Sequence, residues 1–187
     1  MIIKHLDPFY AECRAYGRIE EKGKNGKATV RCYGYLHVAA AQETVLNETF
    51  DVSDWDRPDE EYGQAVSERQ PFRAIVKELV TDTSSFREKM VARMLGDLRS
   101  LRKIGIYVQD IREDNYRGGK LVDFSVSWTI PHIMLSDKLR NGSFIERDIE
   151  NELKSFDTMV KNANIATPFR ATPNQEYLEK LRPRKKG

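Results

Sequence analysis

The sequence predicts an α+β fold, and three observations lead to this prediction. Asp7-Pro8 is a typical helix start, because aspartate caps free backbone N–H groups and proline fits the first helical position. Apolar residues then repeat every three or four positions over 7–21, and they do so again over 86–103. Elsewhere, β-branched and aromatic runs alternate with glycine-containing turns, which is typical of short strands.

The first half of the chain is expected to hold strands on either side of a long polar segment. The β-branched and aromatic runs predict strands over 28–38 and 72–80. The segment 41–70 carries nine acidic residues and predicts a solvated surface insertion or a mobile loop. The alternative is a docking segment anchored by Trp55, because aromatic residues are over-represented among interface hot spots.

The second half begins with the helix over 86–103, for which Gly105 is a suitable C-terminal cap. A short strand at 106–108 follows, and a Gly118-Gly119 turn leads into a strand at 120–122. We then expect a helix over 144–162, a short helical piece over 175–181 and a basic tail over 182–187. The tail is predicted to be solvated, and the alternatives are a nuclear-localisation signal or a contact with an acidic partner.

The composition predicts one folded domain of 187 residues, 40% of them hydrophobic. The 31 basic and 29 acidic residues nearly balance, so direct nucleic-acid binding is not indicated. Cys13 and Cys32 make neither a disulfide framework nor a zinc cluster, and this favours a reducing compartment. No apolar run approaches the roughly 20 residues of a membrane helix. We therefore expect a soluble intracellular protein, nuclear or cytoplasmic, with no membrane partner.

Three oxygen-bearing side chains gather around the Gly118-Gly119 turn. Asp110 opens the loop after the strand at 106–108, Asn115 lies within it, and Asp123 follows the strand at 120–122. Magnesium takes oxygen ligands in near-octahedral geometry and usually shares them with substrate phosphates. The stretch therefore predicts a metal site, and the alternative is an ordinary β-hairpin with polar loop residues.

The spacing of these residues resembles the catalytic loop of protein kinases. In that pattern a catalytic aspartate is followed five positions later by a metal-binding asparagine and then by Asp-Phe-Gly. Asp110 and Asn115 match the first two positions, and Asp123-Phe124-Ser125 matches the third. The resemblance implies that Asp110 is the base and that Asn115 and Asp123 hold the metal ion.

Several longer runs resemble a fungal kinase-like family that includes a centromere and kinetochore subunit. They are D-P-F-Y-A-E-C-R-A-Y-G-R-I, C-Y-G-Y-L, L-V-D-F-S and W-T-I-P-H. The resemblance implies one kinase-like domain over 1–187, in which 1–80 is a remnant N-lobe that contains the acidic insertion 41–70. That lobe would have an αC-like helix and short antiparallel strands. Residues 81–181 would form a short, mostly helical C-lobe with the catalytic-loop hairpin.

The same resemblance implies a nucleotide site. Glu12 would be the helix glutamate that pairs with an ATP-anchoring lysine, and Lys4 is the candidate for that lysine if 1–6 is a strand end. The backbone from Glu78 to Val80 would meet the adenine edge. The cofactor that the resemblance implies is weakly bound Mg-ATP, and the alternative is that the protein has no cofactor.

The chain departs from a working kinase in several places. The glycine-rich phosphate loop is missing, so the sequence looks truncated at its N-terminus. Val108-Gln109 replaces the His-Arg pair before the catalytic aspartate, and Ser125 replaces the glycine after Asp-Phe. Phosphoryl transfer depends on positioning and on neutralising phosphate charge, and each 1.36 kcal/mol lost slows it about tenfold. Weak Mg-ATP binding can therefore outlast catalysis.

These departures lead to three interpretations of function. The first is a kinase-like binding or scaffold protein with little or no transfer activity, possessing a protein partner. The second is an active, compact phosphotransferase in which Asp110, Asn115 and Asp123 act on Mg-ATP and Lys4 with Glu12 anchors the phosphates. The third is a fold unrelated to kinases.

Overall fold

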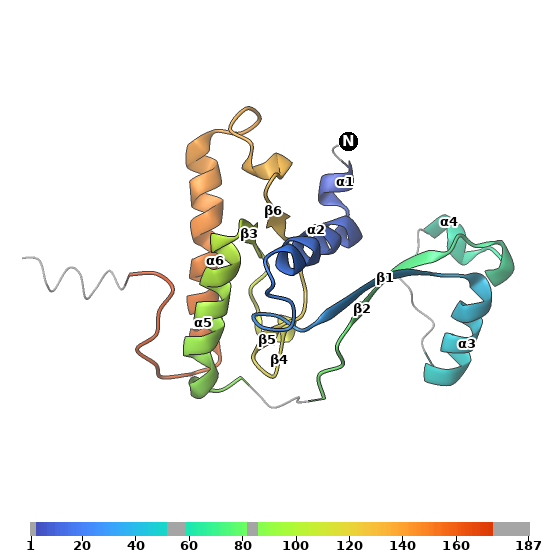
Figure 1. Ribbon diagram of the computed structural model, residues 1–187, viewed down its shortest axis with the longest axis horizontal. Coiled ribbons are helices and arrows are strands. Elements are labelled where there is room, and N and C mark those ends of the chain that lie inside the picture. The colour runs from blue at the N-terminus through green and yellow to red at the C-terminus, as the bar shows by residue number, and fades with distance from the viewer. Residues whose placement is uncertain (1–2, 52–58, 82–85, 174–187) are drawn as a thin grey trace, which may run out of the picture. The chain divides into compact units, whose positions relative to one another are not determined.

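A computed structural model of the chain describes residues 3–51, 59–81 and 86–173. Within these ranges the protein has the predicted α+β character, with short antiparallel strands (Figure 1). The helices are α1 (Ile3–Leu6), α2 (Pro8–Glu21), α3 (Ala40–Phe50), α4 (Asp59–Tyr62), α5 (Glu88–Lys103) and α6 (Gly142–Asn162). The strands are β1 (Cys32–Val38), β2 (Phe72–Lys77), β3 (Ile106–Tyr107), β4 (Tyr116–Arg117), β5 (Lys120–Leu121) and β6 (Trp128–Thr129). Trp55, the helical piece 175–181 and the tail 182–187 lie outside the described residues.

The chain forms two compact units. Unit 1 comprises Met1–Arg31 and Leu79–Gly187, and unit 2 comprises Cys32–Glu78. Among the helices of the described residues, none has both the length and the apolar composition that crossing a membrane requires.

The hydrophobic core of unit 1 lies among α2, α5 and α6. The capping prediction for α2 is confirmed, since the Asp7 side chain accepts a hydrogen bond from Tyr10 N at 3.2 Å. Gly105 ends α5 with φ +81°, as expected for a glycine that follows a helix. The α5 stripe is buried at Val91, Met94, Leu95, Leu98 and Leu101. In Figure 1, α5 and α6 lie side by side, and Arg102 of α5 donates to Ile149 O of α6 at 2.8 Å.

Two short antiparallel strand pairs complete unit 1. The predicted turn is confirmed: β4 and β5 pair around Gly118 and Gly119, which both have positive φ. The strand before the turn is therefore Tyr116–Arg117, whereas β3 pairs with β6. Thr29 bridges in parallel to Leu121, so the predicted strand 28–38 is divided between unit 1 and β1 of unit 2.

The strand end expected over 1–6 is wrong, because Ile3–Leu6 is the helical turn α1. The backbone carbonyl of His5 accepts from Arg14 Nη2 and lies 3.0 Å from His132 Nε2. These two side chains come from distant parts of the chain, and they bind a carbonyl that a helical turn of this length leaves available. Lys4 is consequently in a helix and is not carried by a strand.

Unit 2 is built on an antiparallel ribbon of β1 and β2, with a register irregularity between Cys32 and Gly34. Over Ala40–Phe50, the segment predicted to be a solvated surface insertion or a mobile loop forms the helix α3, and most side chains of this helix are exposed. The helix begins where Ala39 N donates to the Gln42 side chain at 2.8 Å, which satisfies a free N–H group. The buried Glu43 then pairs with Arg69 at 3.0 Å, so α3 is held by polar contacts that an apolar pattern does not reveal.

We expect unit 1 to lose stability in mild acid through His132. Burial lowers the pKa of this side chain from its usual 6.5, the hydrogen bond with His5 O opposes this shift, and Arg14 adds to it. The unfolded chain therefore takes up a proton first, so the stabilisation is present above pH 6.5 and is lost as the pH falls through the lower folded pKa. When urea unfolding is measured at a series of pH values from above 6.5 downwards, the free energy of unfolding should fall less for His132→Gln than for the wild type. An equal loss in both proteins would contradict the prediction.

Candidate functional site

The loop that carries Asp110 is held in place by hydrogen bonds to a side chain of helix α6. Glu152 is 1% exposed and accepts hydrogen bonds from Val108 N and Gln109 N. Gln109 has φ +68°, a conformation that a non-glycine residue adopts only when its surroundings hold it there. The carboxylate of Glu152 thus sets the backbone path immediately before Asp110.

Glu152 also pairs with Arg102 of α5, and their closest nitrogen and oxygen atoms are 2.6 Å apart. Burial raises the pKa of the Glu152 carboxyl, while the hydrogen bonds from Val108 and Arg102 oppose the rise. Glu152 is not among the residues that the sequence motifs predict. Its signal is an acid between Ile149 and Phe156, on the apolar side of an amphipathic helix.

Asn115 and Asp110 are in direct contact, as their spacing predicts. Asn115 is 4% exposed, and its amide nitrogen lies 3.0 Å from both the backbone oxygen and Oδ2 of Asp110. Arg112 Nε lies 3.2 Å from the same carboxylate oxygen. Asn115 is thus a donor toward Asp110, and its own amide oxygen keeps its acceptor capacity for another group.

The strand that precedes Asp123 is attached to this cluster through its backbone. Val122 N donates to Asn115 O at 2.9 Å, so the residue before Asp123 is tied to the Asp110 loop. The Asp123 side chain accepts from Ser125 N at 2.7 Å. The first unit therefore brings the three predicted segments together, with Asn115 as the link between the other two.

Phe124 joins the hairpin to α2. Its backbone N–H donates to Glu12 Oε1 at 2.9 Å, and its ring meets the ring of Tyr16 edge-on at 5.2 Å between centroids. Glu12 is 7% exposed, so this carboxylate faces the interior of unit 1. Glu12 therefore has an observed partner in the Asp-Phe segment.

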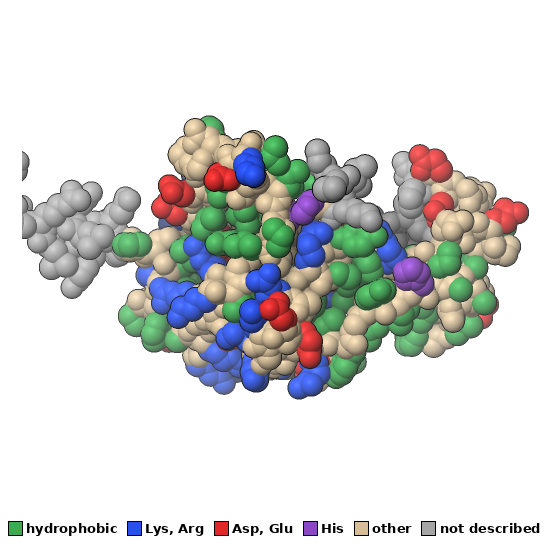
Figure 2. Space-filling model, turned by 45° about the horizontal axis from the view of Figure 1, so that its top comes forward, with side chains coloured by type: hydrophobic (Ala, Val, Ile, Leu, Met, Phe, Trp, Pro, Cys, Tyr) green, Lys and Arg blue, Asp and Glu red, His purple; other side chains and the backbone are tan. Residues whose placement is uncertain are grey.

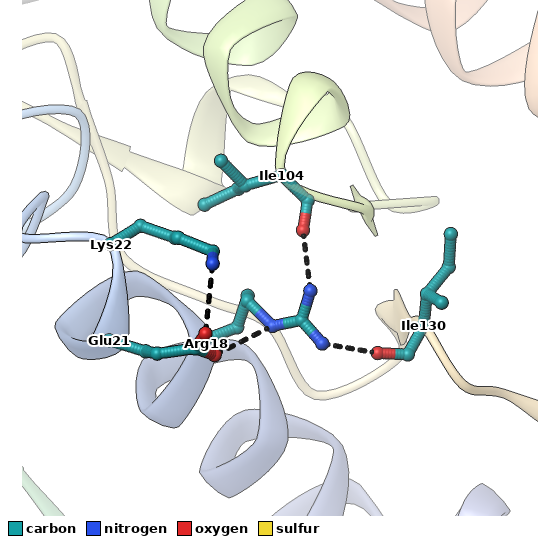
Figure 3. A network of polar contacts seen from close by, with 5 residues as sticks. All are labelled: Arg18, Glu21, Lys22, Ile104 and Ile130. Atoms are coloured by element: carbon teal, nitrogen blue, oxygen red, sulfur yellow. Dashed lines mark hydrogen bonds and ion pairs between the residues drawn. The ribbon is translucent and has the colours of Figure 1, made fainter.

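Arg18 lies in the last turn of helix α2, the helix that also carries Glu12, and it binds this end of the helix to two other segments (Figure 3). The guanidinium donates to Ile104 O at 3.2 Å and to Ile130 O at 2.8 Å, at the ends of α5 and β6. Glu21 holds Arg18 Nε at 3.2 Å and also pairs with Lys22. One side chain thus connects three segments that are far apart in the sequence.

The remaining predicted site residues are not gathered in the same way. The structure describes only the backbone of Lys4, in α1. Glu78 belongs to unit 2 and Val80 to unit 1, so the adenine contact predicted for them stays a prediction. Among the described residues, no three His, Cys, Asp or Glu side chains converge as a metal centre. Asp110, Asn115 and Asp123 fit a magnesium ion only if water and phosphate oxygens supply the other ligands.

A cavity of about 340 Å³ opens beside the Asp110 loop, between the loop and the second half of α6. Its lining is formed by Ile111, Arg112, Glu113, Ser155, Thr158, Met159, Asn162 and Ala163. Ile111, Met159 and Ala163 form the apolar part of this lining, and the other five residues are polar. The predicted catalytic segment therefore borders an accessible hollow.

Replacing Asn115 with alanine is expected to lower the free energy of unfolding by about 1–3 kcal/mol, because the Asp110 backbone and carboxylate lose a buried donor. Urea unfolding monitored by fluorescence measures this. Asn162→Ala is the matched control, since Asn162 is exposed and should change stability by less than about 0.5 kcal/mol. Equal effects of the two substitutions would contradict the role given to Asn115.

A protein-family model matches residues 1–128, and its description is kinetochore Sim4 complex subunit FTA2. The match covers well over half of the chain and includes all the predicted site residues, from Lys4 to Asp123. Helix α6, with Glu152, lies beyond the matched residues. No curated protein and no solved structure matches the chain.

Proposed function

The chain belongs to the kinetochore Sim4 complex subunit FTA2 family, and we propose that it serves there as a kinase-like scaffold subunit without phosphoryl-transfer activity. Membership of this family gives the protein a kinetochore-associated role in the nucleus, with other subunits of a complex as its protein partners. The kinase-like character and the absence of transfer activity are the proposal.

The observation that supports a scaffold is that the polar groups of the loop hold one another. The Asp110 carboxylate is engaged by Asn115 and Arg112, and the Glu12 carboxylate receives the Phe124 N–H group. A general base must be able to take a proton from its substrate, and an anchoring glutamate must hold a lysine near the phosphates. Groups that brace the fold in this way are better suited to keeping a rigid shape than to transferring a phosphoryl group.

A second candidate is an active, compact phosphotransferase. The cavity beside the Asp110 loop favours it, because it leaves open space next to the segment that carries the predicted base. In this alternative Asn115 and Asp123 are the metal ligands, Lys4 and Glu12 anchor the phosphates, and Glu78 to Val80 contact the adenine of Mg-ATP.

We expect Mg-ATP neither to stabilise the purified protein nor to donate its γ-phosphoryl group. A ligand at one hundred times its Kd stabilises the native state by about 2.7 kcal/mol, so millimolar nucleotide reveals even modest binding in a thermal-shift titration. Transfer from radiolabelled ATP to the chain itself, to a generic protein substrate or to water is measured in parallel.

Three variants make this experiment decisive. Asp110→Ala and Asp123→Ala remove the proposed base and a metal ligand, while Asp114→Ala removes an exposed carboxylate from the same loop. Magnesium-dependent transfer that is lost in the first two variants and retained in the third would establish the phosphotransferase instead. Identical behaviour of all four proteins, with no transfer, supports the scaffold.

A further inference from the structure

Unit 2 has almost no hydrophobic core of its own. Among its described residues, Val38 and Glu43 are the buried side chains, and Glu43 is an acid paired with Arg69. An isolated two-stranded antiparallel ribbon is marginally stable in water, because few side chains can be removed from solvent. Unit 2 therefore leaves most of its apolar side chains for another molecule to cover.

Apolar side chains of the β1–β2 ribbon are exposed at several neighbouring positions. Tyr33 is 67% exposed, Tyr35 63%, Leu36 44% and Val76 37%, and we call these four residues the ribbon surface. Tyr35 lies opposite Ile75 on one face, whereas Leu36 lies opposite Ala74 on the other. Both faces of the ribbon are thus open over the same few positions.

Strand β1 is also an edge strand of its sheet. The sheet has two strands, and within the described residues no third strand pairs with either of them. An edge strand presents backbone N–H and C=O groups that can pair with another chain. Three of the four members of the ribbon surface lie on β1, so an added strand along its edge would cover them together.

Charge indicates what kind of strand fits. Residues 32–78 contain ten acidic and four basic residues, a net charge of −6, whereas the whole chain has a net charge of +2. Acidic side chains are visible on unit 2 in Figure 2, and Glu48, Asp51, Glu60 and Glu68 are exposed. Opposite charge guides association and favours the complementary partner, so lysine and arginine side chains are expected on the incoming segment.

We propose that the ribbon surface is the docking site for a basic, apolar segment of another subunit of the kinetochore complex, which adds to β1 as a third strand. This inference rests on the proposed place in a complex and is independent of whether unit 1 transfers phosphoryl groups. Alternating apolar residues of the partner cover the face of β1 that carries Tyr35, while its lysines and arginines reach the acidic residues of unit 2.

The test is site-specific photo-crosslinking in the intact complex purified from its native cells. The photoreactive amino acid p-benzoylphenylalanine replaces Tyr35, and mass spectrometry identifies the crosslinked peptide. The expected result is a peptide of another subunit in which lysine or arginine alternates with apolar residues. A crosslink to unit 1, to a second copy of this chain, or to an acidic segment would overturn the proposal. The same substitution at Phe169, which is 47% exposed in unit 1, is the control and should not give this peptide.

A synthetic peptide of the crosslinked segment then measures affinity with the full chain. Tyr35→Ser should weaken binding about tenfold, because the exposed ring can no longer contact the peptide, and the unfolding temperature of the variant is measured alongside to check that it folds. Glu48→Lys should also weaken binding, and this loss should shrink at high salt. Unchanged affinity in both variants would contradict the docking site. The Mg-ATP experiment concerns Asp110 and Asp123 in unit 1, so the two proposals fail separately.

Discussion

Replacing Glu152 with alanine is expected to lower the free energy of unfolding by about 3–5 kcal/mol, the cost of removing one partner of a buried ion pair. Glu152 is 1% exposed, and Arg102 on the neighbouring helix has a side chain that is 20% exposed. Without the carboxylate, the Arg102 guanidinium is left charged and unpaired in a mostly buried position, and Val108 N loses its hydrogen-bond acceptor. Urea or thermal unfolding of the full chain measures the loss.

Two further variants separate the position of Glu152 from its chemistry. Glu150→Ala removes an exposed acid two residues away on α6, and it should change stability by less than about 0.5 kcal/mol. Combining Glu152→Leu with Arg102→Met should recover only part of the lost stability, because the unpaired charge is removed while Val108 N still lacks an acceptor. A single alanine variant as stable as the wild type would refute the role given to Glu152.

The same substitution should loosen the loop before Asp110. Val108 N donates to Glu152, so its amide hydrogen should exchange faster in Glu152→Ala, while the amides in the middle of α2 should keep their relative protection. Hydrogen exchange followed by mass spectrometry can measure both regions in one sample. A uniform increase across unit 1 would indicate general destabilisation, and the loop would then have no special dependence on Glu152.

Local signals in the sequence were enough to predict the main elements of unit 1. Asp7 and Gly105 mark the start of α2 and the end of α5, and the apolar residues at helical spacing include most of the buried side chains of α5 and, in α2, Tyr16 and Ile19. The glycine pair at 118–119 predicts the β4–β5 turn, because both residues need positive φ. Each of these features depends on neighbours within a few positions, which a single sequence displays.

The missed features depend on partners that are distant in the sequence. The turn α1 is bound by His132, 127 positions from His5, and α3 is held by Arg69, 26 positions from Glu43. Within the candidate site, the spacing of Asp110 and Asn115 predicted their contact, but the supporting Glu152 is 44 positions from Val108. An acid on an apolar helix face indicates that such a partner exists, and only the fold identifies which backbone groups it binds.

Replacing Phe124 with alanine is the other substitution with a large expected effect, a loss of about 3–5 kcal/mol in the free energy of unfolding. The side chain is 1% exposed, and its edge-on contact with Tyr16 connects the segment after Asp123 to helix α2. Truncation removes this contact and leaves a cavity that the surrounding helices can only partly close. Urea unfolding measures the loss.

Phe169→Ala is the matched control for this experiment, because Phe169 is 47% exposed and should lose much less stability. A double-mutant cycle with Tyr16→Ala should give a coupling of about 0.5–1.5 kcal/mol between the two rings. Zero coupling would mean that Phe124 stabilises the core without specifically joining α2 to the hairpin. In that case only the hydrogen bond from Phe124 N–H to Glu12 would join α2 to the segment after Asp123. Because this bond comes from the backbone, Glu12→Ala should then cost the same stability whether residue 124 is phenylalanine or alanine.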